Sequence, residues 1–228
     1  MSLDDRAMPH NTPEARAALV NAPWWAALFT FATFPGAVPE MFVKWTNGDR
    51  CAGMHDTSGA VLYGPAGGGK TSLGIDALKF LARLGYGSTF YWNMVTAPGY
   101  DDPSEPGEPQ LPSPCWFISW ATFLASLRPR GNREGSVSFI SEAVWFADLE
   151  ERVLALMLDD VDVDAGTPFR ESLLLRHMEW ATVPGRRLIL TLNSPPARWG
   201  GIFGERIADR LADPARFTLV PVLGKSLR

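Results

Sequence analysis

Residues 64–71 constrain the fold more than any other part of the chain. They read Gly-Pro-Ala-Gly-Gly-Gly-Lys-Thr, which fits the pattern G-x-x-x-x-G-K-[ST]. Phosphate oxygens need several backbone N–H donors that converge within hydrogen-bond distance, and only a sharply curled loop without side-chain bulk supplies them. A short apolar strand is indicated at residues 60–63 and a helix at residues 71–84. A strand, this loop and a helix in succession predict a site for the phosphates of a nucleotide.

The same pattern predicts the roles of the last two residues of the loop. Lys70 should reach the β- and γ-phosphates, and the Thr71 hydroxyl should hold Mg²⁺. The N-terminus of the following helix adds a partial positive charge. We therefore expect ATP and Mg²⁺ as cofactors. The residues expected to bind the nucleotide are Gly64, Pro65, Ala66, Gly67, Gly68, Gly69, Lys70, Thr71 and Ser72.

Two acidic residues follow an uninterrupted apolar run at residues 154–158, which is typical of a central strand. In α/β sheets, ligands bind at the carboxyl ends of the strands. We expect Asp159 to hold the metal ion and Asp160 to act as the base that activates the attacking water. Asp162 or Asp164 is the alternative base, and Asp160 is preferred because it directly follows the strand.

A polar residue also follows the strand predicted at residues 188–192. Asn193 would lie at the tip of this strand, where its side chain could orient water against the γ-phosphate. Asparagine close before a proline is also a common way to start a turn. Both interpretations stay open on the residues alone.

Two arginines lie four positions apart on one face of a helix predicted at residues 203–211. These are Arg206 and Arg210. An arginine can stabilise the charge that develops on the γ-phosphate, either in its own subunit or in a neighbour. Pairing with acidic residues at helical spacing is the alternative, and the residues alone favour it.

Strands and helices alternate from Gly59 onward, which is typical of a parallel sheet with covering helices. The predicted fold is α/β, with a five-stranded, mainly parallel sheet and helices on both faces. Strands are indicated at residues 60–63, 88–94, 154–158, 188–192 and 217–223, and residues 115–119 fit a short strand. Helices are indicated at residues 71–84, 120–127, 141–151, 167–181 and 203–211.

Two other segments differ from this alternation. Residues 1–58 are expected to form a helical N-terminal extension, rich in aromatic residues, that either packs on the domain or binds a partner. Residues 97–114 contain six prolines, two glycines and four acids, which predicts a surface loop inserted into the nucleotide-binding domain of residues 59–228.

Composition excludes several functions. The net charge of −4 argues against a constitutive polyanion binder, so DNA contact would need a local basic patch or an assembled ring. No run of 18 uncharged apolar residues appears and no secretory signal is visible, which predicts a cytoplasmic protein without a membrane span. The tryptophans of this domain are expected in the core. Trp199, in a loop that contains Gly200 and Gly201, is the candidate exception, open to exposure and base stacking.

Taken together, these segments resemble the AAA+ ATPases of the bacterial DnaC/DnaI helicase-loader and IstB transposition-helper group. The matching order is the phosphate loop, an apolar strand ending in Asp-Asp, a strand ending in Thr-x-Asn-Ser, then Gly-Glu-Arg-x-x-Asp-Arg-Leu and a terminal Gly-x-Ser-x-Arg. The resemblance covers residues 59–228. The loop at residues 97–114 is not a feature of the group.

The resemblance implies roles for four residues. Asn193 would be the sensor-1 residue. Arg210, with Arg206 close by, would be the arginine finger that acts on ATP in the next subunit. Arg228 would match the sensor-2 arginine and contact the nucleotide.

The resemblance also implies a function. The chain would load a hexameric replicative helicase onto single-stranded DNA, with ATP promoting homo-oligomer assembly and hydrolysis resetting the complex. An IstB-like helper that acts on duplex DNA with a transposase is the first alternative. A non-hydrolysing adaptor that binds ATP as a structural switch is the second.

Overall fold

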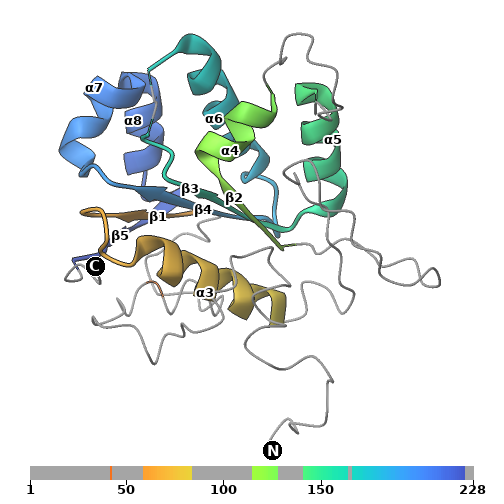
Figure 1. Cartoon of the computed structure of the whole chain (residues 1–228), viewed down its shortest axis with the longest axis horizontal. Helices are drawn as coiled ribbons and strands as arrows, with labels where there is room; N and C mark the ends of the chain where they lie inside the picture. Colours follow the sequence, from red (N-terminus) through yellow and green to blue (C-terminus); the bar gives the residue numbers. More distant parts are fainter. Residues whose placement is uncertain (1–41, 43–58, 84–114, 128–140, 164–165, 224–228) are drawn as a thin grey trace, which may run out of the picture.

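The computed structural model describes residue 42 and residues 59–83, 115–127, 141–163 and 166–223 (Figure 1). The strand predicted at residues 88–94, the loop at residues 97–114 and Arg228 lie outside this set. So does the N-terminal extension, except for Phe42, which is helical and fully buried.

Five strands form a single sheet in the order β2-β3-β4-β1-β5, and every neighbouring pair is parallel. Each strand consists mainly of buried apolar residues, as a sheet covered on both faces requires. The parallel sheet predicted from the sequence is therefore confirmed. The strands are β1 (Gly59–Tyr63), β2 (Cys115–Ser119), β3 (Ala155–Asp159), β4 (Arg187–Leu192) and β5 (Phe217–Pro221).

The helices cover both faces of this sheet. The long helix α3 lies on one face, and α4 to α8 lie on the other (Figure 1). Ser141 and Thr167 cap α5 and α6, since each side chain accepts a hydrogen bond from a backbone N–H in the first turn. The helical elements are α3 (Lys70–Arg83), α4 (Trp120–Ser126), α5 (Glu142–Arg152), α6 (Pro168–Trp180), the 3₁₀ turn η2 (Pro196–Arg198), α7 (Trp199–Phe203) and α8 (Glu205–Ala212).

Alternation along the strands divides the core into two clusters. On β3, Met157 packs in the cluster on the α3 side, whereas Leu156 and Leu158 pack in the larger cluster under the other helices. Phe42 belongs to the α3 cluster. Gly74 lets α3 approach the sheet closely, because a Cβ there would lie 2.6 Å from the Met157 methyl group.

Two sequence predictions differ from the structure near the end of the chain. The helix predicted at residues 203–211 is present as α8, but it begins at Glu205 because Gly204, with a φ of +79°, ends α7 and precedes α8. Trp199 is not exposed in a loop. It is fully buried, its Nε1 donates to the Ser194 carbonyl at 3.0 Å, and its ring packs edge-to-face on Tyr63. Packing therefore outweighed the glycines that follow it.

No helix in the part of the chain that the structure describes has both the length and the apolar character of a membrane-spanning segment.

Candidate active site

The glycine-rich loop connects the carboxyl end of β1 to the first turn of α3. Gly64 has a φ of +149°, and a Cβ at this position would lie 2.2 Å from the Val222 carbonyl oxygen. Gly67 and Gly69 also have positive φ values, of +77° and +91°. The Leu73 N–H already donates to the Gly69 carbonyl at 2.9 Å, so the helix begins directly from the loop. This is the curled backbone that a phosphate-binding loop needs.

Lys70 lies buried beneath this loop. Its Nζ donates to the carbonyl oxygens of Gly64 and Pro65, each at 2.9 Å, and to Oδ1 of Asn193 at 2.8 Å. Burial lowers the pKa of Lys70, while the nearby carboxylates, Asp160 foremost, act in the opposite direction. The lysine therefore connects the loop to the polar residues at the ends of the neighbouring strands.

Thr71 and Asp159 are in contact at the N-terminus of α3. The Thr71 hydroxyl lies 2.9 and 3.1 Å from the two carboxylate oxygens of Asp159. Burial raises the pKa of Asp159 to about 6, and the hydrogen bonds from Thr191 and Thr71 oppose that shift. Hydroxyl and carboxylate oxygens are the hard ligands that Mg²⁺ prefers, so these two residues fit the predicted metal role.

Asp160 follows β3 with a left-handed backbone, at a φ of +56°. Its carboxylate accepts a hydrogen bond from Nδ2 of Asn193 at 3.1 Å. The amide of Asn193 therefore bridges Lys70 on one side and Asp160 on the other. Asn193 does more than begin a turn, since its side chain joins the loop lysine to the predicted base.

Asp162, the alternative base, has a different position. Its carboxylate accepts the backbone N–H groups of Asn193, at 2.8 and 3.0 Å, and of Ser194, at 2.8 Å. These bonds hold the turn after β4. They favour Asp160 as the base because Asp162 is already engaged by the backbone. Asp164 lies outside the described residues.

No protein-family model and no curated protein sequence matches this chain. Solved structures match its fold. A crystal structure of DnaI aligns with a TM-score of 0.59 at 13% identity, over 93% of this chain and 99% of that one. The chain has the AAA+ fold. The prediction made from the sequence is thus confirmed at the level of the fold.

Two structures of DnaA also match this fold. AMPPCP-bound DnaA from Aquifex aeolicus has a TM-score of 0.54 at 17% identity, over 85% of this chain and 50% of that one. DnaA bound to AMPPCP and single-stranded DNA has a TM-score of 0.51 at 15% identity, with the same coverage. The chain therefore spans half of each DnaA chain and nearly all of DnaI.

The two candidate arginines lie apart from this polar cluster. Arg206 is exposed on α8. Nη1 of Arg210 lies 3.1 Å from Oε1 of Glu179, on α6. Within the described residues, neither arginine is hydrogen-bonded to the glycine-rich loop, Asp159 or Asp160. Ser72 occupies the first turn of α3 and is half-buried.

Thr191 belongs to the same cluster, although no role was predicted for it from the sequence. Its hydroxyl contacts both Asp159 and Asp160. The available signal was its position two residues before Asn193, because alternate residues of a strand lie on the same face.

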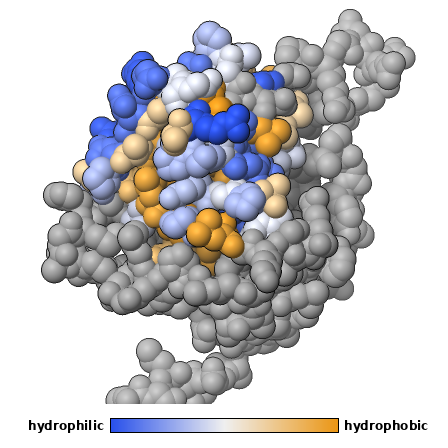
Figure 2. Space-filling model, turned by 90° about the vertical axis from the view of Figure 1, so that its left-hand side faces the viewer, coloured by the Kyte–Doolittle hydropathy of each residue, from blue (hydrophilic) through white to orange (hydrophobic). Residues whose placement is uncertain are grey.

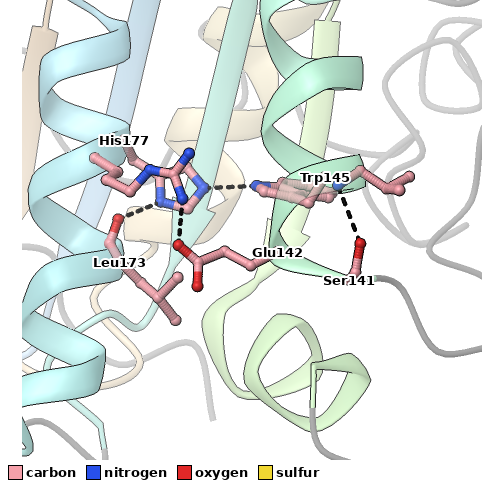
Figure 3. Close-up of polar contacts among 7 residues, drawn as sticks. Ser141, Glu142, Trp145, Leu173 and His177 are labelled. Atoms are coloured by element: carbon pink, nitrogen blue, oxygen red, sulfur yellow. Dashed lines mark hydrogen bonds and ion pairs between the residues drawn. The ribbon is translucent and has the colours of Figure 1, made fainter.

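A polar contact inside the core was also not predicted from the sequence. Nε1 of Trp145, on α5, donates to Nε2 of His177, on α6, at 2.9 Å, and the other ring nitrogen of His177 lies 2.8 Å from the Leu173 carbonyl (Figure 3). Burial lowers the pKa of His177 to about 4. A neutral imidazole satisfies both contacts, so this pair joins two helices without a buried charge.

Proposed function

We propose that this chain is an ATPase of DNA replication that loads a hexameric replicative helicase onto single-stranded DNA. The observation that carries the ATPase part is one connected polar cluster. Lys70 and Thr71 begin α3, and they contact Asn193 and Asp159 at the ends of β4 and β3. Sites at the carboxyl edge of an α/β sheet commonly bind ligands in this way.

Each residue of the cluster has a role that follows from its position. The loop backbone and Lys70 hold the β- and γ-phosphates, and Thr71 and Asp159 hold Mg²⁺. The metal ion, when bound, neutralises charge on the phosphates. Asp160 accepts the proton of the attacking water, and Asn193 orients that water.

Assembly is the second part of the proposal. Arg210, or Arg206 beside it, stabilises the transition state in a neighbouring subunit, which requires a homo-oligomer. Figure 2 shows the side of the molecule on which α7 lies, where hydrophilic and apolar residues are mixed on the surface. A mixed surface of this kind suits reversible, nucleotide-dependent contact. Arg228 would add a further contact to the nucleotide.

Helicase loading rests on the fold comparison. The DnaI structure aligns with this chain over almost the whole length of both, and one of the DnaA structures contains single-stranded DNA. Because the chain carries a net charge of −4, we expect single-stranded DNA to bind only the assembled form. A soluble cytoplasmic protein fits this role.

The first experiment tests the nucleotide site. Lys70→Ala should abolish productive ATP binding, because the β- and γ-phosphates lose their principal counter-ion. A fluorescent ATP analogue measures the affinity, and Asp209→Asn, at an exposed position on α8, is the control. An unchanged affinity in Lys70→Ala would contradict the proposed site.

The second experiment tests helicase loading. The full chain is mixed with ATP, a hexameric replicative helicase encoded in the same genome, and circular single-stranded DNA carrying an annealed strand. Strand release should increase with the natural chain and not with Lys70→Ala. If the natural chain hydrolyses ATP without promoting release, and instead stimulates a transposase on duplex DNA, the IstB-like alternative is correct. If it binds ATP without turnover, it is the adaptor.

A further inference from the structure

Thr191 is a polar residue within the buried part of β4, where its neighbours from Leu188 to Leu192 are aliphatic. It is fully buried, one residue before the end of the strand. In the register of β3 and β4, Leu158 lies opposite Leu190. The next step along both strands brings Thr191 beside Asp159, at the edge of the sheet where the candidate site lies.

The hydroxyl of Thr191 contacts both acids at once. Oγ1 donates to Oδ1 of Asp159 at 2.6 Å and accepts the backbone N–H of Asp160 at 2.8 Å. A hydroxyl has one donor and two acceptor sites, so one oxygen atom can satisfy both partners. The Thr191 carbonyl also accepts the Val161 N–H at 3.0 Å. Three hydrogen bonds therefore connect Thr191 to three consecutive residues at the end of β3, namely Asp159, Asp160 and Val161.

The backbone at Asp160 needs such support. A non-glycine residue rarely adopts a φ of +56°, because its Cβ approaches the following carbonyl oxygen. The hydrogen bonds to the Asp160 and Val161 N–H groups hold this turn from both sides. The Asp160 carboxylate is thereby placed within 3.1 Å of Asn193 Nδ2.

We propose that Thr191 is a positioning residue for both acids, so that one hydroxyl aligns the metal-binding carboxylate of Asp159 with the base, Asp160. The assignment rests on the proposed function. Thr191 acts through these acids and has no contact with the glycine-rich loop among the described residues. Removal of the hydroxyl should therefore impair magnesium use and turnover together, while the binding of the phosphates by the loop persists.

The test compares Thr191→Val, Thr191→Cys and Thr191→Ser, with Thr122→Val as the control at an exposed position on α4. Valine keeps the shape and removes the hydroxyl, cysteine keeps a weak donor, and serine keeps the hydroxyl. The measurements are kcat, KM for ATP, the Mg²⁺ concentration that gives half-maximal rate, and the melting temperature without nucleotide.

For Thr191→Val we expect about a tenfold or greater loss of kcat and a several-fold higher Mg²⁺ requirement, as for the loss of a hydrogen bond to a charged group. Serine should restore both to within about threefold, since its hydroxyl can make the same bonds. Thr122→Val should match the natural chain. If Thr191→Val does not fold, Thr191→Cys takes its place. The kcat of Thr191→Cys should then be lower than the kcat of Thr191→Ser and of the natural chain, but still measurable.

Two results would overturn the assignment. One is a valine variant with the natural kcat and Mg²⁺ requirement. The other is a serine variant as impaired as the valine variant at an unchanged melting temperature, which would make the methyl group responsible. If the natural chain has no ATPase activity, the proposed function fails. The role of Thr191 is then read from the Mg²⁺ dependence of nucleotide affinity, which should still weaken in Thr191→Val and not in Thr191→Ser.

Discussion

Arg210 and Glu179 join α8 to α6, with Nη1 of the arginine 3.1 Å from Oε1 of the glutamate. The arginine side chain is 24% exposed and the glutamate side chain is 55% exposed. An ion pair this accessible contributes at most about 1 kcal/mol, so it can be exchanged for a better anionic partner. Under the proposed function, this contact would hold Arg210 in a defined place within its own subunit until it meets a phosphate bound by a neighbour.

Arg210→Ala should bind ATP nearly normally, because the glycine-rich loop and Lys70 of the same subunit are intact, and it should hydrolyse ATP poorly. Mixing it with Lys70→Ala should restore partial activity, since some interfaces then contain an intact site beside an intact arginine. Specific activity should also rise with protein concentration. Phosphate release across mixing ratios measures this.

Arg206→Ala is the matched control for the finger, and we expect a smaller loss of turnover from it. Mixtures of Arg210→Ala and Lys70→Ala that stay inactive despite demonstrated co-assembly would contradict the shared site. A lowered melting temperature of Arg210→Ala without nucleotide would indicate a structural role for the arginine instead.

Glu179→Gln should release Arg210 from its own subunit. The protein concentration that gives half-maximal specific activity should then fall, by up to about fivefold, which is the factor equivalent to a surface ion pair. Glu150→Gln, at an exposed position on α5, is the control. A higher concentration requirement in Glu179→Gln would show that the glutamate orients the arginine for its neighbour.

Asp160→Asn should retain ATP binding and lose about a hundredfold or more of kcat, because the amide keeps the shape but cannot accept the proton. Asp159→Asn should instead weaken Mg²⁺-dependent binding. Asp162→Asn should change kcat little, since an amide oxygen can still accept the Asn193 and Ser194 N–H groups. Single-turnover hydrolysis distinguishes the three variants. If only Asp162→Asn loses turnover, Asp162 and not Asp160 is the base.

The buried His177 makes stability depend on pH. Its pKa is about 4 in the folded chain, against an ordinary value of 6.5, because burial disfavours the charged ring. Between these values the unfolded chain binds more protons, so the contribution of His177 is complete above pH 6.5 and is lost as the pH falls toward 4. The loss is at most about 3 kcal/mol. Urea unfolding from pH 8 to pH 4 measures it.

The comparison for this pH effect is His177→Gln, whose side-chain oxygen can still accept from Trp145 and does not titrate. The pKa of Asp159 is raised to about 6, which changes stability in the opposite direction, so the histidine contribution is read from the difference between the two chains. The chain has only three histidines, which makes direct titration by NMR practical. A value near 6.5 for His177 would contradict the prediction.

Local patterns were enough to predict that several residues of the candidate site lie close together. The glycine-rich loop, Asp159 and Asn193 each follow an apolar run, and parallel strands bring their carboxyl ends together. The role of Thr191 could not be predicted, because it depends on how β3 and β4 align in register, and no local pattern specifies that alignment. The Arg210–Glu179 contact could not be predicted for a similar reason, because the two residues lie on helices far apart in the chain.

The exposure predicted for Trp199 was wrong because local propensity is a weak guide beside tertiary packing. Gly200 and Gly201 suggested a loop, whereas burial of the indole against Tyr63 stabilises a short helix there. Bulky aromatic residues beside glycines are therefore better judged by the core that they can reach.

The position of β4 between β1 and β3 has a consequence for the effect of deletions in this strand. Its residues from Leu188 to Leu192 are buried, and all except Thr191 are aliphatic, so a strand displaced by one residue would still bury apolar side chains. Such a slip, from a single-codon deletion in this strand, would turn a leucine toward the acids and Thr191 toward the opposite face. Such a subunit would lack the contacts of Thr191 with Asp159 and Asp160, which the proposed function requires for turnover.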